Sequence, residues 1–257
     1  MELTASKLRC FKTCPRKYYF EYIELLKPLE RQEALVTGSN YHECLEHLLS
    51  TGSCPPVTDL PSAMCEAFNK YISWRNWEVK DVEQEYKVRL APGVSLKGKI
   101  DALCADGTPI EHKSSSTKPD EKYRTRLFLD DQVTCYLLAL SIMRGEPVTK
   151  IIYTVCAKPK LKGEGEELLA RQRAWFDEDK VQSFMVVRAA QELEDFQNEL
   201  IYMGRKLQQS SRTRWYRNPQ ACSIMPCAYQ SICQDYDPYC LVGFTKKERE
   251  SEELENN

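Results

Sequence analysis

The sequence predicts one α/β domain in which helices flank a small mixed β-sheet. Apolar residues recur at helical spacing in the first third of the chain and again over residues 127–143. Between these regions the period changes to strand-like alternation, over residues 82–113. A chain of 257 residues is long enough to bury a core of its own. We therefore expect a single domain over residues 1–245.

The first part of the chain is expected to be helical. Residues 3–26 carry apolar and aromatic side chains at helical spacing, interrupted at Cys14-Pro15 because proline cannot continue a helix. A second helix is predicted over residues 38–49. A loop rich in proline, glycine and serine follows over 51–61, and a third helix, rich in aromatic residues, over 63–77.

Three strands are expected next. Residues 82–90 alternate in polarity, and the turn at 91–93 leads to a second strand over 94–104. Asp106-Gly107 forms another turn, and a short third strand covers residues 108–113. The three strands should pair as antiparallel neighbours.

The second half of the chain returns to helices. Residues 127–143 form a strongly apolar predicted helix, and the β-branched run 150–157 a fourth strand. After a basic loop, a short helix is predicted over 166–173 and a long amphipathic helix over 179–208.

The composition sets limits on function and location. The hydrophobic fraction of 42% and charged fraction of 29% are ordinary for a globular protein. A net charge of -2 gives no global signature of nucleic-acid binding, although a basic groove can still form locally. The first residues contain no apolar signal segment and no run is long enough for a membrane span, so we expect a cytoplasmic protein without a membrane partner. Residues 246–257 form a charged tail that we expect to be disordered.

Four short motifs lie in order through the middle of the chain. Two carboxylates ten residues apart, with a lysine two residues beyond the second, are typical of metal-assisted phosphodiester hydrolysis. Each motif alone is weak, since acidic and basic residues at such spacing usually form surface pairs, but their order and spacing together favour a site. The motifs are Gly38-x-x-x-His42-x-x-x-Glu46, Gly98-Lys99-Ile100-Asp101, Glu111-His112-Lys113 and Gln132-x-x-x-Tyr136.

The predicted strands assign chemical roles to these residues. The turn between the second and third strands should bring Asp101 and Glu111 together, where their oxygens would bind Mg²⁺ or Mn²⁺. Lys113 points to the same side of its strand as Glu111, and we expect all three to be catalytic. His112 faces the other way, so only its backbone carbonyl could reach the metal. His42 would complete the ligand set, which favours Mn²⁺ somewhat.

Gln132 and Tyr136 lie one helical turn apart on the predicted helix. We expect both side chains to hold a phosphate or sugar of the substrate.

The twelve cysteines divide into two groups. Six stand singly among apolar or loop residues and are expected to be small buried side chains. The other six lie near the two ends of the chain, so that one distant and three closely spaced thiolates could form a four-cysteine site. Zinc and a [4Fe–4S] cluster both accept four thiolates. The intervals in Cys222-x4-Cys227-x5-Cys233 differ from zinc knuckles and favour iron–sulfur.

From Ser6 to Cys233 the chain resembles the PD-(D/E)xK nuclease superfamily, in its RecB-like branch with an iron–sulfur cluster. That branch includes CRISPR-associated RecB-like exonucleases, AddB-type nuclease domains and phage exonucleases. The resemblance implies a restriction-endonuclease-like core, with segments 1–30 and 210–245 joined by the cluster. It implies the cluster ligands Cys14, Cys222, Cys227 and Cys233, while Cys10 and Cys240 remain possible substitutes.

Two acidic positions differ from the usual pattern. The second carboxylate is Glu111 where aspartate is frequent, and Glu83 and Glu85 match a further acidic position of some relatives, with no assigned role.

The function implied by the resemblance is a Mg²⁺- or Mn²⁺-dependent deoxyribonuclease, most simply an exonuclease on single-stranded DNA ends. It would act in recombination, repair, or phage- or CRISPR-type DNA processing in a bacterial or phage-infected cell, with a recombinase, helicase or adaptation partner. DNA contacts would come from Arg16, Lys17, Arg124, Arg126, the polar loop 114–118 and the basic loop 158–162. A non-catalytic DNA-binding accessory protein and an unrelated zinc or redox protein are the alternatives.

Overall fold

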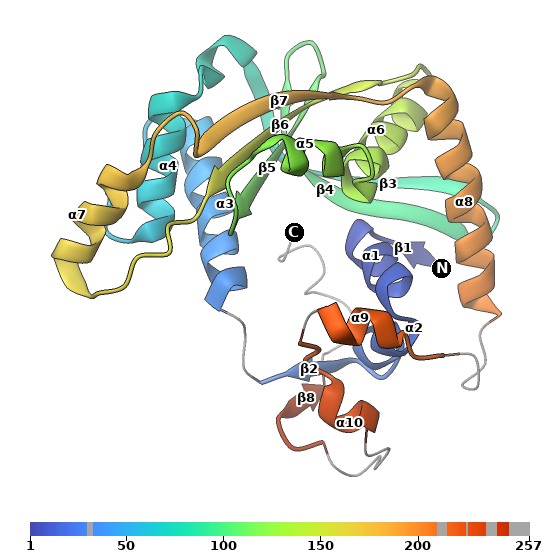
Figure 1. Ribbon diagram of the computed structural model, residues 1–257. Coiled ribbons are helices and arrows are strands. Elements are labelled where there is room, and N and C mark those ends of the chain that lie inside the picture. Colours follow the sequence, from blue (N-terminus) through green and yellow to red (C-terminus); the bar gives the residue numbers. More distant parts are fainter. Residues whose placement is uncertain (30–32, 210–214, 225, 235–240, 247–257) are drawn as a thin grey trace.

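A computed structural model of the chain describes residues 1–29, 33–209, 215–224, 226–234 and 241–246. Within these residues a mixed sheet crosses the molecule, and a separate two-stranded pair lies apart from it (Figure 1). The strands of the main sheet are β1 (Glu2–Leu3), β3 (Val79–Ala91), β4 (Val94–Cys104), β5 (Pro109–Ser115), β6 (Lys150–Ala157) and β7 (Val181–Val187).

Strand β4 organises the sheet. Strand β3 pairs antiparallel along its whole length. The other edge of β4 is shared: β1 pairs parallel with Ser95 and Leu96, and β5 pairs antiparallel with Ala102 and Leu103. Strands β5 and β6 then run parallel from Ile110 to Ser115, and β7 closes the sheet antiparallel to β6.

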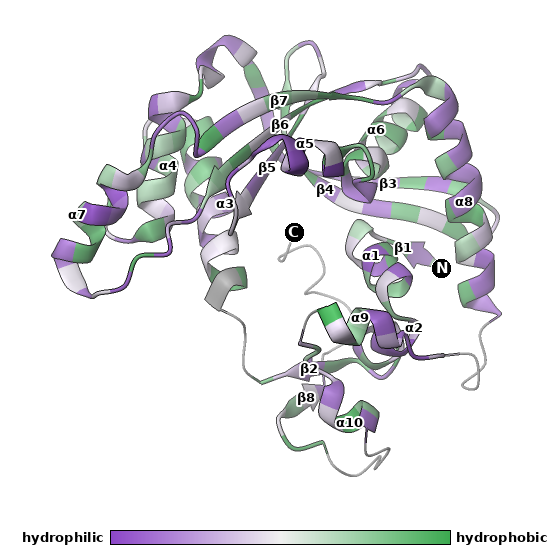
Figure 2. Ribbon diagram, in the orientation of Figure 1, coloured by the Kyte–Doolittle hydropathy of each residue, from purple (hydrophilic) through white to green (hydrophobic). Residues whose placement is uncertain are grey.

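Helices cover both faces of the sheet. One core contains α1 (Ala5–Thr13), α6 (Asp131–Arg144) and α8 (Ala190–Gln208), and the other contains α3 (Glu33–Thr51) and α4 (Leu60–Tyr71). Strand β6 serves both, because Ile151, Tyr153 and Val155 pack in the first core and Cys156 in the second. Hydrophobic residues accordingly gather on the strands and on α6, whereas α7 (Gly165–Trp175) and α8 also carry long hydrophilic stretches (Figure 2).

The two ends of the chain meet beside this core. They contribute the short elements α2 (Pro15–Tyr18), η1 (Tyr19–Ile23), β2 (Leu26–Pro28), α9 (Pro219–Ile224), α10 (Gln230–Gln234) and β8 (Phe244–Lys246). Strand β2 pairs antiparallel with β8, and the hydroxyl of Tyr229 donates to the carbonyl of Leu26 at 2.9 Å. Trp215 is buried, and its ring stacks on Tyr18 with centroids 5.7 Å apart. These contacts hold the C-terminal segment against the N-terminal helices (Figure 1).

The prediction of one helix over residues 179–208 was wrong. Residues 181–187 form β7, and α8 begins only at Ala190. Val181 and Val186 are buried while the residues between them are more exposed, and this short segment forms a strand because it pairs with β6.

The predicted helix over 127–143 is divided. Helix α5 (Glu121–Leu127) ends before it, and α6 starts at Asp131 because Asp130 caps it, accepting from the amide of Gln132 at 2.8 Å. The predicted strands 94–104 and 150–157 match β4 and β6. Residues 247–257 of the predicted tail lie outside the described residues.

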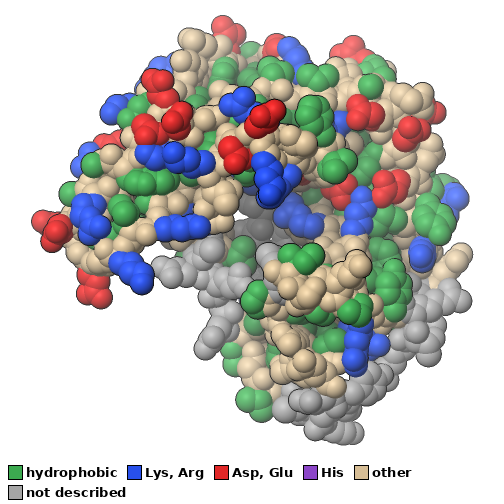
Figure 3. Space-filling view, in the orientation of Figure 1, with side chains coloured by type: hydrophobic (Ala, Val, Ile, Leu, Met, Phe, Trp, Pro, Cys, Tyr) green, Lys and Arg blue, Asp and Glu red, His purple; other side chains and the backbone are tan. Residues whose placement is uncertain are grey.

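Two further features bear on location and surface. None of the helices among the described residues combines the length and apolarity that crossing a membrane requires. One face of the molecule is hollowed near its centre, and Lys and Arg side chains border that hollow (Figure 3).

Candidate metal and catalytic site

The site begins where β4 and β5 separate. Their pairing ends at Ala102 and Ile110, so the next backbone amide on β5, that of His112, has no partner on β4. Asp101 supplies one: its Oδ2 accepts from His112 N at 2.7 Å. The Asp101 side chain is thereby fixed in a site where the residue is only 5% exposed. The fork in the sheet creates a buried carboxylate with a defined orientation.

His42 approaches this carboxylate from α3. Its Nδ1 lies 3.5 Å from Oδ1 of Asp101. Burial acts against charge on both groups, but their attraction outweighs it: the pKa of Asp101 is held well below its usual range, and the pKa of His42 is raised. An imidazole and an ionised carboxylate at this distance form two sides of a cation site.

Glu83 forms a third side. Its neighbours Val82 and Gln84 pair with Ala102 and Ile100, which sets Glu83 opposite Asp101. One ligand atom each from His42, Glu83 and Asp101 lies within 4.8 Å of the others. The backbone of Glu83 has a left-handed φ of 52°, an uncommon conformation for a residue with a side chain. Its carboxylate is paired with Lys99. Glu85, in contrast, is exposed.

Glu111 and Lys113 lie side by side on β5 and form an ion pair. Glu111 is fully buried, and its Oε2 has no hydrogen-bond partner among the described residues. Burial and the negative charge of Asp101 raise the pKa of Glu111 to about 7. Burial opposes the charge of Lys113, but Glu111 and Asp101 outweigh it and raise the pKa of the ammonium group. The lysine therefore stays protonated beside a carboxyl that titrates near neutrality.

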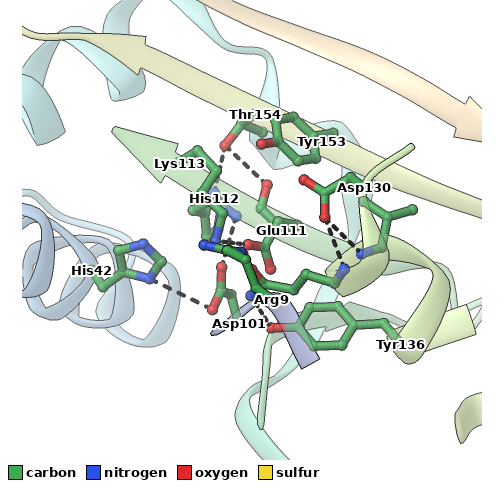
Figure 4. Close-up of polar contacts among 12 residues, drawn as sticks. Arg9, His42, Asp101, Glu111, His112, Lys113, Asp130, Tyr136, Tyr153 and Thr154 are labelled. Atoms are coloured by element: carbon green, nitrogen blue, oxygen red, sulfur yellow. Dashed lines mark hydrogen bonds and ion pairs between the residues drawn. The ribbon is translucent and has the colours of Figure 1, made fainter. Parts of the chain in front are cut away.

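The ring of His112 lies on the opposite face of β5. Its Nδ1 is 2.7 Å from Oγ1 of Thr154, and its ring packs edge-on against Phe68. Burial lowers the pKa of His112 to about 4, so the imidazole is neutral at physiological pH. Of this residue, only the backbone faces the carboxylates, through the amide that Asp101 accepts (Figure 4).

Gln132 and Tyr136 are buried side chains of α6 that bond to each other. The amide nitrogen of Gln132 donates to the Tyr136 hydroxyl at 2.8 Å, while the amide oxygen accepts from Arg9 at 3.3 Å. Arg9 is exposed and comes from α1. Its charge acts on Lys113, and Figure 4 shows the guanidinium between the carboxylates and Tyr136. Gln132 and Tyr136 therefore do not face the site directly; the polar group that they hold there is the Arg9 guanidinium.

The presence of Arg9 at the site and of Glu83 in the candidate metal site was not predicted from the sequence. Arg9 stands far from the four motifs, and reaches them because Lys12 of the same helix is held by Asp131 at the start of α6. Glu83 was noted only as an acidic position with no role. The signal that could have found it was its register opposite Asp101 in a hairpin whose turn was predicted correctly.

The cysteines near the chain ends lie in one region. Cys14 is buried at the junction of α1 and α2, Cys222 is exposed on α9, and Cys227 and Cys233 are half-buried. Cys14 and Cys222 both raise the pKa of Cys233 through charge, after the larger effect of burial, so these three thiols lie near one another. Cys227 packs in a small cluster with Tyr229, Phe20 and Phe244.

The spacing of these thiols bears on the metal they could hold. Among the described residues, no three cysteine sulfurs lie within 4.8 Å of one another. Tetrahedral zinc with bonds of about 2.3 Å would hold its sulfurs roughly 3.8 Å apart. A cluster with one thiolate on each of four irons accommodates a wider set. Cys240 lies outside the described residues.

Cys10 differs from the other cysteines of this region. Its thiol lies 3.8 Å from Oε2 of Glu21, and burial and this carboxylate raise its pKa strongly. A thiol held protonated in this way is a poor metal ligand, because the ligand form is the thiolate.

Arg16 and Lys17 lie beside the cysteines. The amide of Arg16 donates to the carbonyl of Tyr216 at 3.0 Å, and its charge acts on Cys233. The charge of Lys17 acts on Cys10. Both cations are therefore placed to offset negative charge on the thiolates.

The chain is similar to known proteins in family and in fold. The family described as "PD-(D/E)XK nuclease superfamily" matches residues 2–80 and 57–234. A candidate exonuclease from Eubacterium rectale superposes with a TM-score of 0.51 at 10% identity, covering 80% of each chain. An alkaline exonuclease from Laribacter hongkongensis gives 0.34 at 14% identity, covering 81% of this chain and 92% of that one. No curated protein matches.

Proposed function

Because the chain belongs to the PD-(D/E)XK nuclease superfamily, we propose that it is a Mg²⁺- or Mn²⁺-dependent deoxyribonuclease whose catalytic residues are Asp101, Glu111 and Lys113. The observation that carries the proposal is the fork between β4 and β5, which buries two carboxylates next to a protonated lysine. Such a group of charges has no packing purpose and costs folding free energy unless it binds a ligand.

The donor set fits a divalent cation. His42, Glu83 and Asp101 offer an imidazole nitrogen and carboxylate oxygens within 4.8 Å, and Glu111 adds a buried oxygen with no described hydrogen-bond partner. We assign His42, Asp101, Glu111 and the His112 carbonyl as ligands, with Glu83 as an additional one. The cation would lower the pKa of the attacking water and offset charge on the phosphate.

The remaining chemistry belongs to the side chains. Lys113 keeps its proton and can donate it in a hydrogen bond to the scissile phosphate or to the attacking water. Arg9, held by Gln132, can donate two parallel hydrogen bonds to a phosphate oxygen pair. Burial of Asp101 and Glu111 keeps bulk water from competing for these contacts.

The thiols near the chain ends form the second proposed cofactor site, a [4Fe–4S] cluster on Cys14, Cys222, Cys227 and Cys233. The proximity of Cys14 and Cys222 to Cys233, the sequence spacing of the four cysteines, and the cations Arg16 and Arg217, which lower the pKa of Cys233 against burial, support this assignment. The cluster would be structural, holding the C-terminal segment on α1 and α2.

The mode of cleavage is proposed to be exonucleolytic, on single-stranded DNA ends, within DNA recombination, repair or phage- or CRISPR-type processing. The Eubacterium rectale protein of similar fold, described as a candidate exonuclease, fits this mode. A recombinase, helicase or adaptation protein would supply the strand.

A cleavage assay tests the proposal. End-labelled linear and circular single-stranded DNA are incubated with the holoenzyme and Mn²⁺ or Mg²⁺, beside Asp101→Asn and Lys113→Ala. We expect cleavage of the linear DNA alone, falling by about 10³-fold or more in each variant. The controls Asp106→Asn and Lys150→Ala change exposed residues of the same charge and should keep activity. Binding without cleavage by the wild type would instead indicate a DNA-binding accessory protein.

A further inference from the structure

A pocket of about 310 Å³ opens where β5 and β6 end. The two strands are parallel and stay paired to Ser115 and Ala157, and the amide of Lys158 continues the ladder by donating to Ser115 O at 2.7 Å. The loops that follow them therefore start side by side. Ligands commonly bind at the carboxyl ends of parallel strands, where successive loops diverge.

The pocket wall combines cations with an aromatic ring. Lys118 comes from the loop after β5, Lys158 and Lys160 from the loop after β6, and Trp175 from the end of α7. None of the described residues that line the pocket is acidic. In a chain of net charge -2, three lysines without a carboxylate among them are a local departure.

Charged side chains near the pocket include one carboxylate and the lysines of the pocket wall. Asp177 is a nearby carboxylate: it pairs with Lys180, and the charge of Lys118 helps to lower its pKa. Burial lowers the pKa of Lys158, so an anion in the pocket would favour its charged form. Lys160 is exposed at the rim. The pocket is thus suited to a phosphate rather than to a cation or a neutral solute.

Trp175 supplies a surface for a base. The Lys180 ammonium lies 4.6 Å from the centre of its ring, and Phe176 packs edge-on against it. These contacts fix the orientation of the indole, which is half-buried. Proteins that bind single-stranded nucleic acids combine aromatic rings, on which the bases stack, with cations, which bind the phosphates. A fixed indole beside lysines provides this combination.

The pocket lies close to the catalytic group. Ser116, one of its lining residues, directly follows β5 and is three residues beyond Lys113, or about 10 Å at the extended rise of about 3.3 Å per residue. We propose that the pocket binds one nucleotide of the DNA strand a short distance from the scissile phosphodiester, its phosphate on Lys158 and Lys160 and its base on Trp175. This rests on the proposed nuclease function.

Paired lysine variants test the proposal. Lys160→Gln removes a lining charge, and Lys150→Gln removes the same charge from an exposed residue at the opposite end of β6, outside the pocket lining. For linear oligothymidylate we expect Lys160→Gln to raise KM about five- to tenfold with kcat within twofold. It should also reduce the salt slope of log KM by about 0.7, the value for one phosphate on a single strand. Lys150→Gln should change KM less than twofold. Equal effects of the two variants would overturn the proposal.

A binding experiment separates this site from the catalytic one. In the Asp101→Asn holoenzyme, oligothymidylate should quench tryptophan fluorescence, and Trp175→Phe should remove most of the quench, while a circular-dichroism spectrum checks folding. If the wild type shows the fluorescence quench but does not cleave DNA, the nuclease proposal is wrong and the nucleotide-binding proposal for the pocket stands. If the wild type cleaves DNA but the quench persists in Trp175→Phe, the nucleotide-binding proposal for the pocket is wrong and the nuclease proposal stands.

Discussion

Arg9 shows how one side chain depends on its neighbours. Its guanidinium lies at the site only because Gln132 accepts from it, and Gln132 is itself fixed by Tyr136 and by the capped start of α6. The motif Gln132-x-x-x-Tyr136 was predicted to contact substrate. In the structure both residues are buried and hold Arg9, so we interpret them as positioning residues and Arg9 as the phosphate contact.

A double-mutant cycle checks this interpretation. Arg9→Ala should raise KM for single-stranded DNA about tenfold or more, because one charge-assisted contact is lost. Gln132→Ala should cause a smaller rise in the wild type and almost none in the Arg9→Ala background, since it acts through Arg9. Arg89→Ala, an exposed arginine on β3, is the control. Additive effects of the two substitutions would show that Gln132 contacts the substrate independently.

His112 gives the protein a pH-dependent stability. Its pKa is about 4 in the folded state and near 6.5 in the unfolded chain, so the unfolded state binds more protons in between. The contribution of His112 is complete above pH 6.5 and is lost as the pH falls toward 4. At pH 5 the loss is about 2 kcal/mol, from about 1.4 kcal/mol per pKa unit.

Urea unfolding at pH 7 and pH 5 in metal-free buffer measures this effect. The pKa values of Glu111 and His42 are raised, which acts in the opposite direction, so the comparison is made with His112→Asn. The wild type should lose about 2 kcal/mol more than the variant between the two pH values. An equal loss in both proteins would contradict the neutral, buried assignment.

At the scale of elements, the pairing of β3 with β4 explains the glycine of the Gly98-Lys99-Ile100-Asp101 motif. Gly98 pairs with Tyr86, whose ring lies over it, and a Cβ at Gly98 would come within 2.5 Å of the Tyr86 hydroxyl oxygen. Tyr86 is buried and packs edge-on against Tyr136. The glycine thus provides space for a ring that supports the positioning pair Gln132 and Tyr136.

Gly98→Ala should lower the free energy of unfolding by about 1–3 kcal/mol, as overpacking does, and raise KM by displacing Tyr136. Gly38→Ala is the matched control: the added methyl would meet only Ser114 Oγ, at 3.4 Å, inside helix α3. There alanine should be neutral or stabilise by up to about 1 kcal/mol. Chemical denaturation of the wild type and the two variants measures these free energies. An unchanged free energy of unfolding in Gly98→Ala would show that Tyr86 can move away.

The elements that could be predicted from the sequence are those whose pattern is local. Strands β4 and β6 have clear turns or β-branched runs, and the hairpin order placed Asp101 near Glu111. Strand β7 was missed because seven residues are too few to show a period before the strong pattern of α8 begins. Strands β1 and β8 are shorter still and exist only through distant partners. Arg9 was missed for the same reason, since it is brought in by helix packing.

The whole molecule is closed by contacts between segments some two hundred residues apart. The side-chain amide of Asn218 donates to Thr13 O at 2.8 Å, the amide of Arg16 donates to Tyr216 O at 3.0 Å, and β2 pairs with β8. The first two contacts are made at and just beyond the end of α1, which carries both Cys14 at its end and Arg9 toward the site. The proposed cluster would therefore stabilise the helix that carries Arg9, the proposed phosphate contact.

The cysteines test this coupling. Cys222→Ser should release the cluster, measured as loss of bound iron and of absorption near 400 nm, and lower Tm by about 10 °C, because a cross-link closing so long a loop contributes roughly 4 kcal/mol. It should also raise KM through Arg9 while Lys113 chemistry persists, so kcat falls less than KM rises. Cys10→Ser is the control, since its thiol is paired with Glu21 and should not be a ligand. Zinc in the purified protein would contradict the cluster, and unchanged KM after iron loss would contradict the coupling.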